Sequence, residues 1–232
     1  MTSPTVSAII TVKNGEKYIG SAIESILRQE YPPLEILVVD DSSTDDTLNI
    51  AGSFPKVQLL ERTRPGIGNG WNTGIKNASG DLVAFLTHDD LWTANKLKVQ
   101  VAAIETDREK LFAVSRFEYF LEDENYIPSG FRPNLLSESH LGLTPHTLLA
   151  SPEAFDTVGL FDEDLSTGED TDWFSRAKDL EVPYLIVPQV LLKVRIHKSN
   201  TSLNTQENDQ NLLEIIKRSI ERKKAKKAST NG

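Results

Sequence analysis

Residues 6–41 read VSAIITVKNGEKYIGSAIESILRQEYPPLEILVVDD. This stretch opens with a nearly continuous apolar run at Val6–Val12, which is typical of a strand covered on both faces. Apolar residues at helical spacing follow from Glu16 to Gln29, and a second apolar run occupies Leu34–Val39. A strand, a helix and a second strand in this order predict a βαβ unit of a mostly parallel sheet.

The alternation of strands and helices continues toward the middle of the chain. We expect further helices at residues 42–51, 71–78 and 94–106 and further strands at residues 57–60 and 82–86. Repeated βα units place helices on both faces of a sheet, and ligands of such sheets bind outside the carboxyl ends of the strands. Those ends are Lys13-Asn14, Asp40-Asp41, Glu61–Gly66 and Thr87–Asp90. The topology therefore predicts an acidic ligand site at one edge of the sheet.

The second half of the chain is less regular, which gives an α/β fold with a small mixed C-terminal part. A strand is expected at Leu111–Leu121, a loop-rich segment at 122–143, two short strands within Pro183–Val194 and an amphipathic helix at 205–227. The predicted organisation is a single domain at residues 1–204, with a nucleotide-binding half at 1–110 and an acceptor half at 111–204. The amphipathic helix and a basic tail would follow at 205–232.

Composition narrows the chemistry and the partners. The 232 residues include no cysteine, which excludes disulfides, thiolate metal ligands and a cysteine nucleophile. The apolar run Ala8–Val12 is too short for a signal or a membrane span and has no basic segment before it, so a cytoplasmic location is expected. The net charge is −9, and residues 1–210 carry 18 basic and 32 acidic residues. Nucleic acid is therefore disfavoured as a partner, and a bound nucleotide diphosphate would need a cation.

Two of the strand ends carry paired aspartates. After the second strand, Asp40 can accept hydrogen bonds from a base or a ribose hydroxyl, and Asp41 alternatively caps the next helix. After the fourth strand, Asp89 and Asp90 offer carboxylate oxygens that suit Mg²⁺ or Mn²⁺. The alternative for this second pair is an exposed turn that caps a helix. His88 precedes it, either as a solvated side chain or as a nucleotide contact.

A glycine string follows the third expected strand. Gly66, Gly68 and Gly70 resemble a phosphate-cradling motif, but no clear strand-to-helix turn contains them. We therefore expect a flexible loop around the ligand, with Arg62 or Arg64 available to a base or a phosphate.

Charged residues in the second half supply further candidates. Glu169, Asp170 and Asp172 begin a helix, and a favourable interaction with the helix dipole explains Glu169 and Asp172 well. The same position allows Asp170 to act as a general base. His197 and Lys198 follow a strand, where a structural histidine is the ordinary explanation and contact with a leaving diphosphate or a metal is the alternative.

Taken together, these segments resemble the family 2 glycosyltransferases, which have the GT-A fold and use nucleotide sugars. The resemblance runs from Val6 to about Ser202. Its segments are SAIITVKNGEKYIGSAIESILRQEYPPLEILVVDDSSTDDT, RPGIGNGWNTGIKNASGDLVAFLTHDD, VGLFDEDLSTGEDTDWFSRA and VRIHKSNTS. The second segment is similar to the one that ends in the DxD-type metal motif of the family, and the third to the one that carries the catalytic base.

The resemblance implies roles for individual residues. Thr11 and Asn14 would border the nucleotide, and Asp41 would contact its base. Asp89 would be the metal ligand and Asp170 the general base. The other expected contacts are Asp40, Arg64 and His88 for the nucleotide, His197 for the metal, and Glu169, Asp172, Trp173 and Lys198 for the acceptor or the diphosphate.

The expected reaction is inverting transfer from a nucleotide diphosphate sugar, most commonly a UDP sugar, with Mn²⁺ or Mg²⁺ as cofactor. The acceptor would be a hydroxyl-bearing glycan, lipid-linked molecule or protein. Two departures from the family pattern are Thr87, in place of the first aspartate of the metal motif, and Trp71, where arginine is frequent. They motivate one alternative, a non-catalytic nucleotide-sugar-binding module. A nucleotidyltransferase is a second alternative, for which Lys13 is a poor phosphate-gripping match.

The last residues predict a surface helix with a basic end. We expect its apolar stripe to dock on the domain. The stripe consists of Leu212, Leu213, Ile215, Ile216 and Ile220. Five basic residues follow within Arg222–Lys227, and they predict weak, salt-sensitive association with an anionic membrane, with a solvated tail as the alternative.

Overall fold

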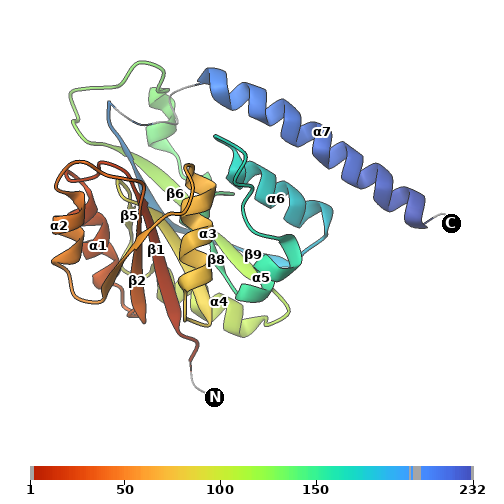
Figure 1. The fold of residues 1–232 in the computed structure, drawn as a ribbon, viewed down its shortest axis with the longest axis horizontal. Helices are drawn as coiled ribbons and strands as arrows, with labels where there is room; N and C mark the ends of the chain where they lie inside the picture. Colours follow the sequence, from red (N-terminus) through yellow and green to blue (C-terminus); the bar gives the residue numbers. More distant parts are fainter. Residues whose placement is uncertain (1–2, 199, 201–204, 231–232) are drawn as a thin grey trace.

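The computed structural model describes residues 3–198, 200 and 205–230, with side chains at 3–198, 200 and 211–225. Within these residues nine strands form one sheet, whose parallel part is built around β1 (Val6–Val12) (Figure 1). The strands β2 (Glu35–Asp40) and β4 (Leu82–Thr87) pair in parallel with β1 on either side. The strand β3 (Val57–Glu61) pairs in parallel with β2. The predicted mostly parallel sheet is confirmed.

Strands from the second half extend the same sheet in a mixed arrangement. The strand β8 (Leu149–Ala150) is antiparallel to β4 and to β6 (Phe112–Leu121). The long strand β9 (Tyr184–Ile196) is parallel to β6. Two short strands, β5 (Leu91–Trp92) and β7 (His140–Leu141), pair antiparallel with β9 and β6, respectively.

The expectation of two short strands within Pro183–Val194 is wrong. This segment belongs to the single 13-residue strand β9. Register shifts around Ser115 and Arg116 of β6 interrupt the ladder, and pairing resumes beyond them up to Leu121 and Ile196. A bulge of this kind lets one strand continue where the sequence indicates a break.

Helices cover both faces of the sheet. On one face, α1 (Ile19–Leu27) and α4 (Lys96–Thr106) contribute buried apolar residues to one core. On the other face, α3 (Ile67–Asn77), α5 (Pro152–Val158) and α6 (Glu169–Asp179) form a second, aromatic-rich core. The remaining helical segments are α2 (Thr47–Gly52), two 3₁₀ turns at Pro133–Ser137 and Pro145–Thr147, and α7 (Thr205–Thr230). In the part of the chain that the structure describes, no helix has the length and apolarity needed to cross a membrane.

The helix α2 begins later than predicted, at Thr47 and not at residue 42. Residues 42–46 form a loop, in which Ser42 has a φ of 56°. The backbone N–H of Ser43 donates to Asp40 Oδ2 at 3.0 Å. Asp40 therefore caps this loop directly after the end of β2.

The helix α3 lies very close to β1. It begins at Ile67, so the flexible loop expected at Gly66–Gly70 is wrong. A β-carbon on Gly70 would lie 2.9 Å from Thr11 Cγ2, and one on Gly74 would lie 2.3 Å from Ile9 Cγ2. The glycines therefore serve the close packing of this helix on the sheet, since any larger residue would push the helix away.

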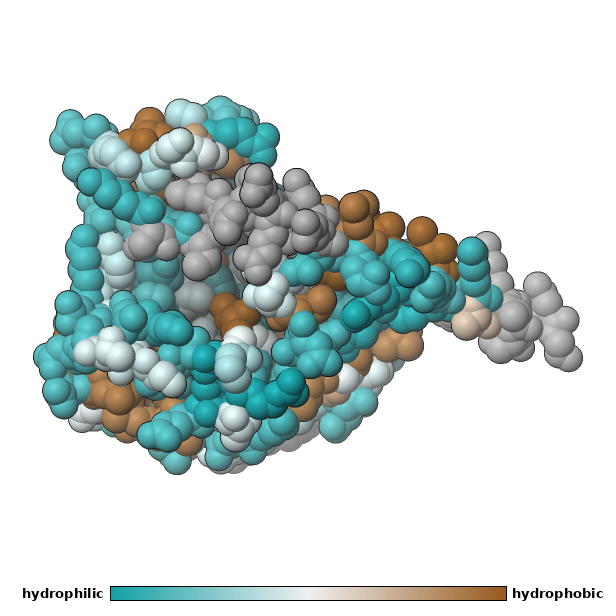
Figure 2. Space-filling view, turned by 45° about the horizontal axis from the view of Figure 1, so that its top comes forward, coloured by the Kyte–Doolittle hydropathy of each residue, from teal (hydrophilic) through white to brown (hydrophobic). Residues whose placement is uncertain are grey.

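The helix α7 packs on the domain through one side and extends beyond it (Figures 1 and 2). Ile215 is 2% exposed, as expected of a docked stripe, whereas Leu213 is 71% exposed. The rest of the stripe is also exposed, and it consists of Leu212, Ile216 and Ile220. The prediction that the whole stripe docks on the domain is therefore wrong.

Ion pairs on the opposite side of α7 explain why most of the apolar stripe faces outward. Arg218 Nη1 lies 2.8 Å from Asp162 Oδ2, and Arg222 Nε lies 2.9 Å from Asp179 Oδ2. Lys223 Nζ also lies 3.3 Å from Asp179. Part of the basic end is thus neutralised by the domain itself. The predicted basic residues Lys226 and Lys227 have side chains outside the described residues.

We predict that Gly74→Ala destabilises the protein by about 1–3 kcal/mol, because the new methyl group would collide with Ile9 in β1. The matched control is Gly52→Ala at the end of α2, where a β-carbon would lie 3.5 Å from Leu59 Cδ1 in ordinary contact. Urea unfolding of the two variants measures the difference. Equal stabilities would contradict the close approach of α3 to β1.

Candidate active site at the carboxyl ends of the parallel strands

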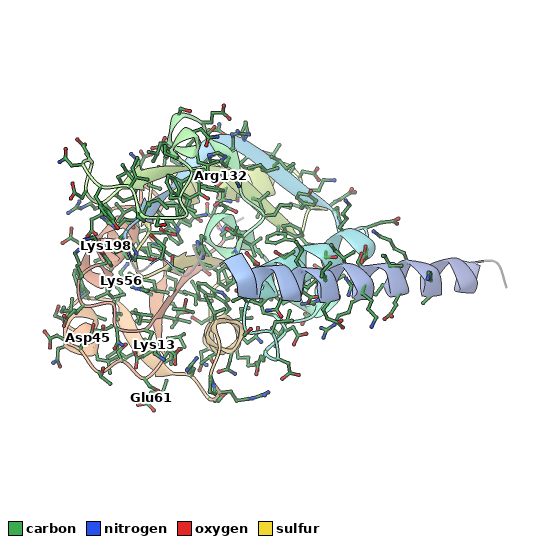
Figure 3. All side chains as sticks on the ribbon, turned by 90° about the horizontal axis from the view of Figure 1, so that it is seen from above. Lys13, Asp45, Lys56, Glu61, Arg132 and Lys198 are labelled. Carbon is green, nitrogen blue, oxygen red and sulfur yellow. The ribbon has the colours of Figure 1, made fainter. Side chains whose placement is uncertain are left out.

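The register of the parallel strands brings the predicted strand ends together. Val12 pairs with Asp40, and Thr11 pairs with Thr87. A pocket of about 460 Å³ lies at these ends, a volume in the range of small-molecule sites. Its lining includes Thr11, Lys13, Asn14, Tyr18, Asp41, Arg62, Gly66, Gly70, His88, Asp89 and His197. Figure 3 looks down on the carboxyl ends, with Lys13 labelled.

One side of the pocket is formed by an ion pair between an acidic and a basic side chain. Asp41 is partly exposed and forms an ion pair with Arg62, whose side chain is 11% exposed. Lys13 Nζ lies 3.8 Å from the other oxygen of Asp41. Arg64 does not line this pocket and is directed to Glu163 and Asp164 instead. The sequence offered both arginines, and the structure brings Arg62 to the pocket.

The neighbouring wall comes from the loop after β1. Asn14 has a φ of 49° and accepts a hydrogen bond from the backbone N–H of Thr44 at 2.9 Å. Thr11 is 9% exposed and packs beside Gly70 of α3. His88 is partly exposed and covers Gly15, where a β-carbon would lie 2.6 Å from the imidazole. These residues shape the pocket wall, and Asn14 also joins two strand-end loops.

The two aspartates after β4 face different surroundings. Asp89 lines the pocket, and its Oδ2 lies 3.0 Å from His197 Nε2 at the end of β9. Asp90 is 3% exposed and accepts hydrogen bonds from Thr87 Oγ1 and from the backbone N–H of Arg195, each at 3.0 Å. Thr87 thus holds Asp90 inside the fold, and Asp89 is the aspartate after β4 that lines the pocket.

The charge of Asp89 is favoured by its neighbours. Burial works against ionisation, yet the hydrogen bond with His197 and the nearby His88 hold the pKa of Asp89 well below its usual range. The ring of His197 also packs against that of Tyr18, with centroids 4.9 Å apart. An ionised carboxylate suits Mn²⁺ or Mg²⁺ with open positions for phosphate oxygens and water, whereas an imidazole ligand is more typical of Zn²⁺ and other transition metals. These two residues fit a cation site, although no cluster of three acidic or histidine ligands occurs among the described residues.

A second group of titratable residues lies at the first turn of α6. Asp170 is partly exposed, and its Oδ1 accepts hydrogen bonds from the backbone and hydroxyl of Thr171 at 2.6 and 3.2 Å. Glu169 is 6% exposed and packs beside Gly68 of α3. Burial, followed by the charge of Asp170, raises the pKa of Glu169 to about 7. The first turns of α3 and α6 are therefore in contact. The helix α3 lines the pocket, and α6 carries Asp170.

His146 completes this group, and the sequence gave no reason to select it. Its Nδ1 lies 3.2 Å from Asp90 Oδ2. Burial lowers the basicity of this imidazole, but the hydrogen bond and charge of Asp90 prevail and raise the pKa of His146 above its usual value. Asp89 and Asp170 act on it in the same direction. His146 therefore lies in the field of both groups of carboxylates.

Three other residues that were predicted to contact the acceptor or the diphosphate do not line this pocket. Asp172 is 2% exposed and forms an ion pair with Arg176 at 2.7 Å. Trp173 is fully buried in the aromatic core and donates its ring N–H to the Gly159 carbonyl at 2.9 Å. Lys198 is exposed, and its Nζ lies 4.6 Å from the centre of the Tyr126 ring, in an adjoining pocket (Figure 3). Neither Asp172 nor Trp173 reaches the pocket, because both pack inside the fold.

Trp71, one of the departures from the family pattern, is also a core residue. Its side chain is fully buried, and its ring meets that of Phe85 edge to face at 5.5 Å. Sequence reasoning missed Tyr18 and His146, and no local pattern marks either residue. Arg62, which the sequence offered together with Arg64, lines the pocket directly after β3.

We predict that Glu169→Gln changes the pH dependence of stability. The folded-state pKa of Glu169 exceeds the unfolded value, so the wild-type protein loses stability as pH rises from about 4.5 to about 7. The glutamine variant lacks this loss and should gain about 3 kcal/mol relative to wild type between pH 4 and pH 7.5. The exposed Glu153→Gln on α5 is the control. A constant difference across this window, measured by urea unfolding, would refute the expectation.

Comparison with known proteins shows the family and the fold to which this sheet and the loops at its strand ends belong. Residues 7–158 match the family model described as Glycosyl transferase family 2. The chain is 36% identical over 222 residues to an uncharacterized glycosyltransferase of Rickettsia typhi, and the match covers 88% of this chain and 69% of the relative.

Two solved structures share the fold. The first is S. aureus TarS 1–349 in complex with UDP, with a TM-score of 0.67, 22% identity and coverage of 83% of this chain and 60% of that one. The second is the mannosyltransferase PcManGT from Pyrobaculum calidifontis in complex with GDP-Man and Mn²⁺, with a TM-score of 0.70, 20% identity and coverage of 95% and 65%. This chain thus spans less than two thirds of both. It belongs to glycosyltransferase family 2 and has the GT-A fold.

Proposed function

We propose that this chain transfers a sugar, with inversion, from a nucleotide diphosphate sugar to a hydroxyl-bearing acceptor. The observation that carries the proposal is the convergence of the Asp41–Arg62 pair and the Asp89–His197 pair in one pocket, with Asp170 on the adjoining helix. The UDP and GDP-Man complexes of the two structural relatives support a nucleotide-sugar donor. We favour UDP as the donor nucleotide.

The donor nucleotide would occupy the pocket beside β1 and β2. Asp41 can accept a hydrogen bond from a base N–H, and Asp40 remains a cap of the adjacent loop. Arg62 is the arginine within reach of the nucleotide, since it lines the pocket. The diphosphate would lie toward Asp89 and His197, which would hold Mn²⁺ or Mg²⁺. A bound cation there supplies charge neutralisation for the diphosphate.

Asp170 would act on the acceptor. It removes the proton of the attacking hydroxyl while the oxygen forms a bond to the anomeric carbon. The bond between that carbon and the diphosphate oxygen breaks on the opposite face, and a nucleoside diphosphate leaves. The hydrogen bonds from Thr171 orient the carboxylate of Asp170. The acceptor itself would be a glycan, a lipid-linked molecule or a protein.

We predict that UDP binding depends on a divalent cation held by Asp89. Calorimetric titration of UDP should give an affinity at least about tenfold higher with Mn²⁺ than with a chelator, because the acidic site otherwise repels the diphosphate. Asp89→Ala should remove this difference. The control Asp164→Ala, at a side chain that is 81% exposed and outside the pocket, should retain it. Equal affinity with and without Mn²⁺ in the wild-type protein would rule the cation out.

We predict that Asp170→Asn lowers sugar transfer by about 10²–10⁴-fold and leaves the affinity for UDP within about threefold. A base that acts on the acceptor affects turnover and not donor binding. Asp156→Asn, an exposed change on α5, is the control. Release of UDP from a panel of UDP sugars and acceptor glycans measures turnover, and detection of pyrophosphate instead would indicate a nucleotidyltransferase. Wild-type turnover in Asp170→Asn would remove Asp170 from the mechanism.

A further inference from the structure

One side of α7 carries an apolar strip that the described part of the domain covers only partly, across a groove that Leu212, Ile216 and Ile220 share with α6. The strip contains Leu212, Leu213, Ile216 and Ile220, which are 44%, 71%, 47% and 48% exposed. Leu143, 43% exposed, continues it toward the domain across a shallow groove shared with Ile216. In Figure 2 hydrophobic side chains line one edge of the projecting helix and hydrophilic ones the other. Isolated exposed leucines are common on soluble proteins, but a row along one helix edge is a contiguous surface.

The orientation of this strip is fixed by polar contacts on the opposite side of the helix. Asn211 Nδ2 donates to the Thr167 carbonyl at 3.0 Å, and Arg218 and Arg222 pair with Asp162 and Asp179. Ile215 closes the contact, since its Cδ1 would lie 3.2 Å from a β-carbon on Gly168. The strip therefore cannot turn inward without breaking several ion pairs and hydrogen bonds.

The charges around the strip are of one sign. At 100° per residue, Lys217, Lys223 and Lys224 lie within about 90° of the centre of the strip. The two acids of this part of the helix, Glu214 and Glu221, lie more than about 120° from it. Lys217 and Lys224 are exposed and have no ion pair among the described residues, while Lys223 is 56% exposed beside Asp179. The exposed face is thus apolar at its centre and basic at its borders.

We propose that this face of α7 binds the surface of an anionic lipid bilayer, with the helix lying in the plane of the interface. An apolar strip bordered by lysines is the pattern of interfacial helices, in which the apolar side chains enter the headgroup region and the lysines meet anionic headgroups. A second copy of the chain is the less suitable occupant. A twofold contact through this face would bring the lysines of both copies together.

The sequence places membrane contact in the basic tail, and the structure moves it to this face. Arg218, Arg222 and Lys223 are engaged with acids of the domain, so the apolar side chains carry the contact and the lysines Lys217 and Lys224 assist. Binding of this kind goes beyond glycosyl transfer and does not depend on it. If the proposed transfer holds, the bilayer would lie across α7 from the segment that leads into Asp170, because Asn211 and Ile215 hold residues 167 and 168 on the opposite side of the helix.

Co-sedimentation with vesicles tests the proposal. The full chain is mixed with vesicles of phosphatidylcholine alone or with 40% phosphatidylglycerol, a composition of about the charge density of an anionic membrane. The wild-type protein should bind only the anionic vesicles. Leu213→Gln/Ile216→Gln should lower the partition coefficient by about tenfold or more, since two inserted apolar side chains are lost. Lys217→Gln/Lys224→Gln should lower it by about tenfold and reduce its salt dependence.

The matched control is Leu34→Gln/Ile186→Gln, which replaces two apolar residues that are 48% and 52% exposed away from α7. It should bind like the wild type. Circular dichroism and UDP affinity show that each variant is folded, and both should be unchanged because the replaced side chains are exposed. No binding by the wild type, or equal loss in the control, would overturn the proposal. So would a dimer in sedimentation velocity that Leu213→Gln/Ile216→Gln dissociates, because the face would then belong to a second copy.

Discussion

The site depends on the pairing of carboxylates with basic side chains at one edge of the sheet. Parallel strands bring their carboxyl ends together, and here those ends deliver Asp41, Asp89 and Asp90 to one region. Carboxylates brought to one region repel one another unless neighbouring groups offset their charge. Arg62 forms an ion pair with Asp41, and Asp89 and Asp90 lie 3.0 and 3.2 Å from the imidazole nitrogens of His197 and His146. Each basic partner comes from another part of the chain, so the fold must close before the acids are stabilised.

The glycines of α3 are the second condition for this site. Gly70 and Gly74 let the helix approach β1, and the first turn of the helix then forms part of the pocket wall. On its other side, the same turn touches Glu169 through Gly68. One helix thus joins the pocket at the strand ends to the segment that carries Asp170. A wider spacing between α3 and the sheet would separate the two groups of carboxylates.

Much of the fold could be predicted because hydrophobic pattern determines strands strongly. The runs at Val6–Val12, Leu34–Val39 and Leu82–Leu86 are apolar throughout, and a buried parallel strand is the structure that accommodates such a run. The strand ends then follow from topology, which placed Asp41 and Asp89 at one edge. The sequence offered a metal contact of His197 only as the alternative to a structural histidine, because no local pattern pairs it with Asp89, from which it lies 108 positions away.

The sequence predictions that were wrong share one physical cause. In each case the local sequence allowed two structures, and a tertiary contact selected one of them. The glycine string at 66–70 fits a loop or a closely packed helix, and only the proximity of β1 selects the helix. Arg62 and Arg64 are equivalent in sequence, yet they project to different partners. The segment 183–194 contains a break in its pattern that register shifts between β6 and β9 absorb, with the extra residues in β9. None of these partners lies close in sequence.

The helix α7 is the clearest case in which tertiary contacts select between alternatives that the local sequence leaves open. Its apolar periodicity indicates which residues share a side, but not which side faces the domain. That choice belongs to Asp162 and Asp179, which hold Arg218 and Arg222 on the opposite side from most of the stripe. The Arg218–Asp162 pair is partly exposed and individually weak, whereas the Arg222–Asp179 pair is shielded on its acidic side, where Asp179 is 4% exposed. Acting together with the burial of Ile215 and the three contacts of Asn211, they fix one orientation and leave four apolar side chains in contact with solvent. The acidic residues of the domain therefore determine the orientation of α7. They neutralise its arginines, and the apolar strip and its lysines consequently face outward.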